Sequence, residues 1–407
     1  MANPFFQTYR YQQVMMSLLK NVATLTTATN SRVRSVSIPC FSHSHCRIDA
    51  FQPVQSQTCP KKHFVFVNVH QCSATPVTSV LRRYALAYNL TMALSPPNLP
   101  RSFFERGLGF PDLISPKYIY RLGGMKHRGI PLETSFLYQR FNLETWQSVM
   151  PRDSVYLAVM REPLDQLRSL LAFIEFSSPM PSCLFPASQD LTVHVFYFQI
   201  LDFFANPNAH HFYVKQEETT FSWTKNFMAF TLGFPQNAPM KDAVRYLQHI
   251  DGAFDLVLLA EYLMESMVLL RRKMCWPMRD VVFMPLKTRE NEKVTFTEEL
   301  QRKSRAWNKV DHLFYDHFKR KLFDDISKEK DFQKELQRFK EVNMNINRFC
   351  ESLTKNGTQF YVVPESDWNE GFTFTKHNCL ALNGTNVVMG EMRKRLDGII
   401  DLRSGVV

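Results

Sequence analysis

The chain has 407 residues and a formal net charge of +11, with 45% hydrophobic and 13% aromatic residues. This length allows one large domain or two ordinary ones, and the apolar content suits a packed core rather than a disordered chain. The basic charge permits an anionic ligand or an anionic surface as a partner, although a generally basic surface explains it equally well. The sequence has no lysine-rich tract with interleaved aromatic residues, so nucleic acid is not an expected partner.

Composition divides the chain into three parts. Residues 1–60 are rich in Ser, Thr, Gln and His without sustained periodicity, and we expect a poorly ordered leader or stem. Residues 61–350 are expected to form the globular domain, and residues 351–407 a C-terminal extension to which the sequence assigns no structure. A membrane-spanning helix needs about 18 consecutive apolar residues. The chain has no such run, so it shows no clear transmembrane anchor.

The first predicted element is a strand, loop and helix between residues 64 and 90. Phe64–Val67 is a short apolar run that favours a buried strand. Apolar residues then recur at helical spacing from Val77 to Tyr88, and Pro76 suits the first turn of a helix. A loop that leads from a strand into a helix N-terminus offers free backbone N–H groups and a positive dipole end. A phosphate or sulfate ester is therefore the first ligand to consider.

A second segment repeats this arrangement. The apolar run 155–160 predicts a buried strand that leads directly into Arg161, Glu162 and a helix carrying Ser169. An arginine at a strand end can bind a phosphate through two N–H groups, and Ser169 can add a hydroxyl. The alternative is structural, with Arg161 in an ion pair and Ser169 bonded to its own backbone.

Other segments complete the predicted fold. Residues 254–259 predict a third buried strand, and residues 264–274 predict the helix after it. Residues 294–345 have a charged, helical pattern. Residues 118–122 predict a short strand, and the strongly apolar residues 191–204 predict a buried helix. Because strands alternate with helices, we expect an α/β fold with a mainly parallel sheet flanked by helices.

Three further segments carry a resemblance to a known family. They are Arg140-Phe141-Asn142, HLFYDHFKRKLFDDI at 312–326 and FDLVLLAEYLMESMVLLRRKMCWPMRDVVFMPLK at 254–287. Together with the two loops, they resemble the galactose-3-O-sulfotransferases, a family that includes galactosylceramide (cerebroside) sulfotransferase. The resemblance covers roughly residues 60–350. It implies a P-loop-like sulfotransferase fold in the Golgi lumen or at the Golgi membrane. It also implies 3′-phosphoadenosine 5′-phosphosulfate (PAPS) as the sulfuryl donor, a galactosyl lipid or glycan as the acceptor, and no metal.

The resemblance also assigns roles to residues of the two loops. His70 would be the general base that takes the proton of the acceptor hydroxyl. The alternative is a loop histidine with a structural hydrogen bond. Cys72 is alternatively a reactive thiol near a helix N-terminus. The donor would be bound by the backbone and side chains of both loops, at Gln71, Cys72, Ser73, Ala74, Thr75, Arg161 and Ser169.

The first loop departs from the family pattern in its charge. The family usually has Lys-Thr-His-Lys-Thr, whereas this chain has Asn68 and Gln71 at the lysine positions. Those lysines would neutralise charge that develops during sulfuryl transfer. Two hypotheses follow. The protein either sulfates a galactose 3-hydroxyl, or it is a catalytically impaired relative that binds adenosine 3′,5′-bisphosphate or a glycan.

The remaining patterns concern metals, disulfides and glycans. None of the eight cysteines forms a Cys-x-x-Cys pair, and the spacing of His312 and His317 does not suit a zinc-binding helix, so no metal site is expected. An even cysteine count permits disulfides. Glycosylation sequons begin at Asn89, Asn356 and Asn383, and together with the family resemblance they favour a luminal domain.

Overall fold

The computed structural model describes residues 60–93, 132–135, 140–177, 200–208, 213–216, 219–285, 296–353 and 360–383. Nearly all of them belong to one compact unit that spans residues 58–174 and 187–407, and the fold described below is that of this unit. Residues 1–59, the strand expected at 118–122 and the sequon at Asn356 lie outside the described residues.

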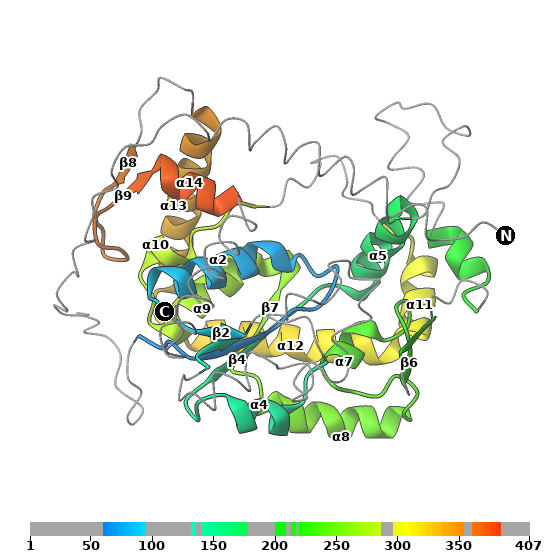
Figure 1. The fold of residues 1–407 in the computed structure, drawn as a ribbon. Coiled ribbons are helices and arrows are strands. Elements are labelled where there is room, and N and C mark those ends of the chain that lie inside the picture. Colours follow the sequence, from blue (N-terminus) through cyan, green and yellow to red (C-terminus); the bar gives the residue numbers. More distant parts are fainter. Residues whose placement is uncertain are drawn as a thin grey trace, which may run out of the picture. The chain divides into compact units, whose positions relative to one another are not determined.

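The centre of the unit is a five-stranded sheet in which all neighbouring strands are parallel. Its order is β2 (Met92–Ala93), β3 (Thr134–Ser135), β1 (Phe64–Val67), β4 (Val155–Met160) and β7 (Leu256–Leu259). Strands β1, β4 and β7 are buried at every position, as expected when both faces of a parallel sheet are covered. In Figure 1, α2 (Ala74–Ala87) lies above the strands and α8 (Met240–Asp251) below them. The predicted α/β class is confirmed.

Helix α2 packs on the sheet through the apolar positions that its sequence predicts. Val77, Val80, Leu81 and Tyr84 are all buried. The ring of Tyr84 stacks on Trp276 with 3.6 Å between ring centroids. This packing holds α2 with its N-terminus at the end of β1, where the polar loop lies.

The chain after β7 is mainly helical. A 3-10 turn, η1 (Ala260–Tyr262), leads from β7 into α9 (Leu263–Met274). The helical pattern predicted for 294–345 is confirmed, and it corresponds to α11 (Glu298–Trp307), α12 (Lys309–Lys328) and α13 (Phe332–Ser352). Within the predicted helix 191–204, residues 200–204 are helical, and the preceding part lies outside the described residues. Further elements are α4 (Leu143–Val149), α5 (Pro163–Ser177), β5 (Tyr213–Gln216), β6 (Thr219–Ser222), α7 (Phe227–Thr231) and α10 (Met278–Val281).

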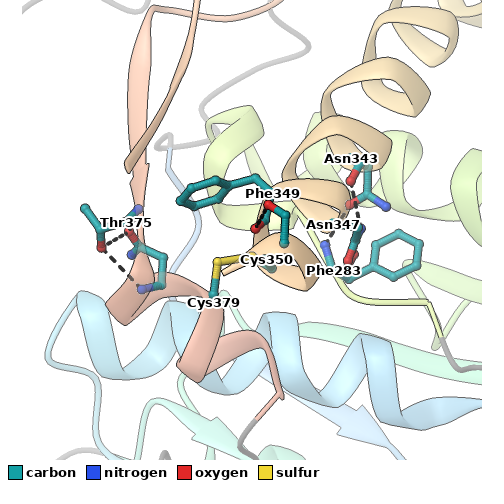
Figure 2. Close-up of a disulfide and its surroundings, with 9 residues drawn as sticks. Phe283, Asn343, Asn347, Phe349, Cys350, Thr375 and Cys379 are labelled. Atoms are coloured by element: carbon teal, nitrogen blue, oxygen red, sulfur yellow. Dashed lines mark hydrogen bonds between the residues drawn. A yellow bond between two sulfur atoms is a disulfide. The ribbon is translucent and has the colours of Figure 1, made fainter. Parts of the chain in front are cut away.

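The segment after α13 packs on the α/β core. Strands β8 (Phe360–Val363) and β9 (Phe372–Thr375) form an antiparallel hairpin, followed by α14 (Lys376–Asn383). A disulfide between Cys350 and Cys379 joins α13 to α14 (Figure 2). The hydroxyl of Ser79 on α2 donates to the Leu382 carbonyl at 3.5 Å. Residues 360–383 are therefore integrated with the helix that follows the first loop.

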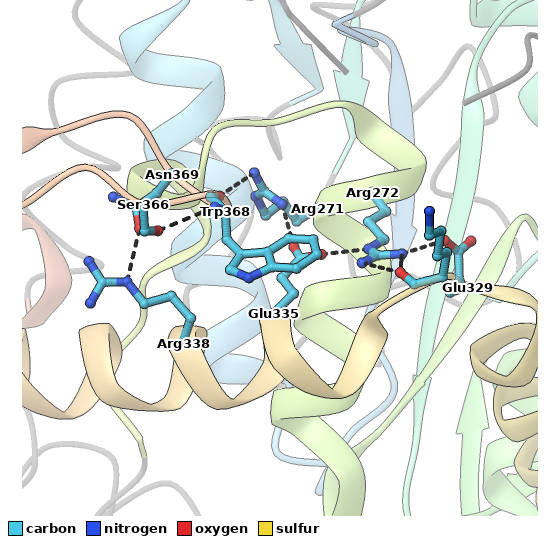
Figure 3. Close-up of polar contacts among 9 residues, drawn as sticks. Arg271, Arg272, Glu329, Glu335, Arg338, Ser366, Trp368 and Asn369 are labelled. Atoms are coloured by element: carbon cyan, nitrogen blue, oxygen red, sulfur yellow. Dashed lines mark hydrogen bonds and ion pairs between the residues drawn. The ribbon is translucent and has the colours of Figure 1, made fainter. Parts of the chain in front are cut away.

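A buried ionic cluster connects α9, α13 and the hairpin (Figure 3). Glu335 is 1% exposed and accepts hydrogen bonds from Arg271 and from Arg272 Nε, the latter at 2.6 Å. Arg272 also contacts Glu329 at 2.7 Å, and Arg271 donates to the Trp368 carbonyl at 2.9 Å. Because each charge has a partner, the cluster avoids the large cost of an unpaired buried ion.

Two other findings bear on the sequence expectations. Within the described ranges, no helix is both long enough and apolar enough to cross a membrane. The sequon residue Asn89 is exposed and has a φ of 61°, whereas Asn383 is the last residue of α14.

Candidate active site

The candidate site lies where three parallel strands end. Residues 68–73 follow β1, residues 161–162 follow β4, and residues 260–262 follow β7. Carboxyl ends of parallel neighbours lie at one edge of the sheet, which is where open α/β sheets bind their ligands. Asp255, by contrast, precedes β7 and so lies at the opposite edge, where its carboxylate accepts the Tyr156 N–H at 2.8 Å.

The first loop reaches α2 through two residues in the left-handed backbone region. Gln71 has a φ of 61° and Ser73 a φ of 54°, and neither is glycine. Such conformations cost on the order of 1–3 kcal/mol and tend to occur at functional sites. Ser73 is the N-cap of α2, but its side chain makes no capping hydrogen bond, and the first turn has no acidic residue. The positive end of α2 therefore lacks a carboxylate of its own and favours an external anion.

The second loop differs, because its helix end already has a carboxylate. Glu162 accepts the backbone N–H groups of Leu164 at 2.8 Å and Asp165 at 2.9 Å, at the start of α5. Burial raises the pKa of Glu162 to about 7, although these two hydrogen bonds oppose the shift. An anion at this loop would therefore be bound by side chains, and the half-buried Arg161 and Ser169 are the ones present.

Direct hydrogen bonds join the two loops. Arg161 donates to the carbonyl of Gln71 at 3.3 Å, and the Ser169 hydroxyl donates to the side-chain oxygen of Gln71 at 2.7 Å. Gln166 donates to the His70 carbonyl at 3.3 Å. Strands β1 and β4 are parallel neighbours, so their loops lie at one edge of the sheet. Gln71 is the residue that both Arg161 and Ser169 contact.

His70 lies in an apolar environment within the first loop. Its ring packs edge-on against Trp223 with 5.7 Å between centroids. Burial lowers the pKa of His70 to about 3. The imidazole is therefore neutral at physiological pH, which is the form that can accept a proton, but its basicity is low.

The other residues of the first loop divide by exposure. Cys72 is a free thiol with no exposed surface, and burial raises its pKa. A protonated, buried thiol is a poor nucleophile, so the structure favours packing over reactivity for Cys72. Ser73 is half-buried, Ala74 is buried and Thr75 is exposed. Only the backbone of Cys72 and Ala74 is suited to an anion, whereas Ser73 and Thr75 also offer hydroxyls.

The histidine and aspartate residues of α12 do not converge on a metal. His312 pairs with the Ser304 hydroxyl at 2.9 Å and His317 with Asp251 at 2.8 Å. Asp311 accepts the Ala229 N–H at 2.7 Å. Among the residues that the structure describes, no group of three or more His, Cys, Asp or Glu side chains is arranged to hold a metal ion.

Glu261 and Tyr315 belong to this edge, but no role in the donor site is predicted for them from sequence. Glu261 follows β7 directly and accepts the Glu162 N–H at 2.9 Å and the Tyr315 hydroxyl at 3.1 Å. The only sequence signal is the position of Glu261 after an apolar run. The contact with Tyr315 spans 54 residues and has no local signature.

Comparison with known proteins identifies the family. The family model described as galactose-3-O-sulfotransferase matches residues 4–360. The chain belongs to the galactose-3-O-sulfotransferase family. This confirms the resemblance drawn from the loops and the two long segments.

Individual relatives cover about two thirds of the chain. Human galactose-3-O-sulfotransferase 2 is 31% identical over 70% of this chain and 66% of its own length. The Sus scrofa protein of that name is 33% identical over 65% of this chain and 62% of its own length. Mouse galactosylceramide sulfotransferase is 26% identical over 64% of this chain and 56% of its own length. The chain thus spans between 56% and 66% of the length of these relatives. No solved structure gives a significant match.

Proposed function

We propose that this protein transfers a sulfuryl group from PAPS to the 3-hydroxyl of a galactose in a glycolipid or glycan. The observation that carries the proposal is the contact of Arg161 and Ser169 with Gln71, which joins the two expected donor loops in one site. A sulfotransferase requires a sulfuryl donor, and the family membership makes such a donor the expected ligand.

Such a donor has two anionic groups, the 5′-phosphosulfate and the 3′-phosphate, and each would be bound by a different loop. The N-terminus of α2 has no carboxylate in its first turn, so the backbone from Ser73 to Thr75 suits the 5′-phosphosulfate. The N-terminus of α5 is occupied by Glu162, so the 3′-phosphate would depend on the Arg161 guanidinium and the Ser169 hydroxyl. The donor would supply an activated sulfuryl group at this edge of the sheet.

His70 is the proposed general base. Its neutral imidazole can take the proton from the galactose hydroxyl as that oxygen attacks. A bound anion beside His70 would stabilise the imidazolium and raise its pKa. A bound donor would therefore oppose the effect of burial, which lowers the pKa of His70 in the ligand-free protein.

The second candidate function is binding without efficient turnover. The loop has Asn68 and Gln71 at the family's lysine positions, and the Gln71 side chain already accepts a bond from Ser169. Asn68 is 1% exposed and donates to Thr78 at 3.4 Å, so it presents no charge to a ligand. In this alternative, adenosine 3′,5′-bisphosphate or a glycan binds at the same edge without reaction.

The proposed location is the Golgi lumen or membrane. The disulfide between Cys350 and Cys379 supports an oxidising compartment, because such bonds are rare in reducing ones. The exposed Asn89 sequon agrees with a luminal protein. The acceptor is proposed to be galactosylceramide-like or a galactose-terminated glycan, since relatives with both kinds of name match the chain.

The test is transfer of labelled sulfate from PAPS to galactosylceramide and to a lactose-terminated oligosaccharide. The wild-type protein should label at least one acceptor, and His70→Ala should not. His63→Ala is the matched control and should retain activity, because His63 precedes β1 at the opposite edge and pairs with Asp153. A wild-type protein that binds adenosine 3′,5′-bisphosphate but labels neither acceptor would support the second candidate instead.

A further inference from the structure

Glu261 connects three elements at the carboxyl edge of the sheet. It follows β7, and one of its oxygens accepts the backbone N–H of Glu162, which follows β4, at 2.9 Å. Its other oxygen accepts the hydroxyl of Tyr315, on α12, at 3.1 Å. Tyr315 is only 4% exposed, so its hydroxyl approaches Glu261 from a packed helix.

The bond to Glu162 acts on the peptide that immediately follows Arg161. The N–H that Glu261 accepts belongs to the peptide unit between Arg161 and Glu162. Fixing that planar unit restricts the backbone direction at Arg161, whose guanidinium donates to the Gln71 carbonyl at 3.3 Å. Tyr315 is thus connected to the first loop by hydrogen bonds through Glu261 to the second loop, and from there by the Arg161 side chain.

The carboxylate of Glu162 binds the residues that follow it, at the start of α5. It accepts the N–H groups of Leu164 and Asp165 and so holds the first turn of α5. Glu261 therefore orients the residue before this turn, and Glu162 orients the helix that carries Ser169. Without Glu261, the N–H of Glu162 would lose its acceptor, while α5 would keep the cap that the Glu162 carboxylate provides.

We propose that Glu261 is a positioning residue that holds the second loop so that Arg161 can bind the 3′-phosphate of the donor, with Tyr315 fixing Glu261. The inference rests on the proposed function, since it assumes that Arg161 binds this phosphate. It assigns Glu261 no contact with the reacting atoms. It also gives a physical role to one residue from each of the two long segments that resemble the family.

The experiment compares two nucleotides that differ by the 3′-phosphate. Binding of adenosine 3′,5′-bisphosphate and of adenosine 5′-monophosphate is measured by calorimetry for the wild type, Glu261→Ala, Glu261→Gln and Tyr315→Phe. Small misplacements of a binding group can cost on the order of 100-fold, so Glu261→Ala should weaken bisphosphate binding by about 10- to 100-fold. Binding of the monophosphate should change little, because the first loop is retained.

The conservative variants separate positioning from general damage. Glu261→Gln keeps an oxygen for the Glu162 N–H, and its amide can donate to the Tyr315 oxygen, so most of the bisphosphate affinity should return. Tyr315→Phe removes a single hydroxyl and should give an intermediate loss. In Arg161→Ala, the further change Glu261→Ala should add almost nothing, because both act on one contact.

The outcomes distinguish this inference from the proposed function. If the wild type binds bisphosphate but Glu261→Ala binds it equally well, or loses both nucleotides equally, the positioning role is wrong while the donor site stands. If the wild type binds bisphosphate no better than monophosphate, the proposed donor site is wrong and the role of Glu261 falls with it.

Discussion

At the scale of single residues, the site depends on the two amide side chains of the first loop, Asn68 and Gln71. Gln71 is half-buried and lies between Arg161 and Ser169, whereas Asn68 is buried at the end of β1. A cation at position 71 can therefore reach the site, but one at position 68 would be placed in an apolar environment at a high cost. Position 71 is the place to test the missing charge.

Gln71→Lys is expected to raise sulfate transfer. One stabilising donor beside developing charge is worth roughly 10²–10³ in rate, and the nearby Arg161 reduces this gain by repulsion. We expect an increase of at least about tenfold in the labelled-sulfate assay. Gln71→Met is the control, since it has similar length without charge and should not increase the rate. If the lysine and methionine variants behave alike, charge at this position does not limit the reaction.

Gly233 lies where there is no room for a side chain. It has a φ of 104°, and a Cβ there would lie 2.1 Å from the Tyr246 hydroxyl and 2.7 Å from the Phe141 carbonyl. Gly233→Ala should lower the free energy of unfolding by about 1–3 kcal/mol or more. Gly252→Ala is the matched control, because a Cβ there meets nothing within 4 Å. Equal stability of the two variants in urea denaturation would contradict the crowding at Gly233.

At the scale of elements, sequence patterns predict strands better than they predict contacts. Strands β1 and β4 have the predicted bounds because each is a short apolar run between polar loops. Strand β7 begins two residues later than predicted. Phe254 is buried, as a strand residue would be, but it lies before the strand, so its apolar character misplaces the predicted start. The order of the strands and the bond from Ser169 to Gln71 depend on chain packing over 98 residues, which no local pattern encodes.

The ionic cluster between α9 and α13 is expected to be sensitive to loss of Glu335. Its removal leaves Arg271 and Arg272 without their buried partner, and breaking such a pair costs about 3–5 kcal/mol. Glu335→Ala should therefore lower the free energy of unfolding strongly. Glu299→Gln, which breaks the surface pair with Lys303, should leave the unfolding temperature unchanged. A small effect of Glu335→Ala would mean that the two arginines find other partners or water.

At the scale of the whole molecule, buried groups make the free energy of unfolding depend on pH in opposing ways. Burial lowers the pKa of His70 to about 3 and of His312 to about 4, so their contribution is present above pH 6.5 and is lost as the pH falls. Burial raises the pKa of Asp311 and of Glu162 to about 7. These carboxyls are protonated more readily in the folded state, so their contribution grows as the pH falls from about 7 to about 4.

Asp311→Asn isolates the contribution of Asp311 to the pH dependence of the free energy of unfolding. Asp311 accepts N–H groups at the start of α7, and an asparagine oxygen can accept one of them. Between pH 4 and 7 the wild type should lose stability relative to the variant as the pH rises, by at most about 1.4 kcal/mol per pH unit. Urea denaturation at pH 5 and pH 7 measures this. A stability difference that does not change with pH would mean that Asp311 does not titrate in this range.

We propose that the two loops form one donor site in which Arg161 binds the 3′-phosphate. Calorimetric titration of adenosine 3′,5′-bisphosphate into the wild type and Arg161→Ala tests it most directly. Arg245→Ala, which removes an exposed arginine on α8, serves as the control with the same change in charge. We expect Arg161→Ala to lose about 2–5 kcal/mol of binding free energy, while Arg245→Ala binds as the wild type does. Equal binding by all three proteins would contradict it.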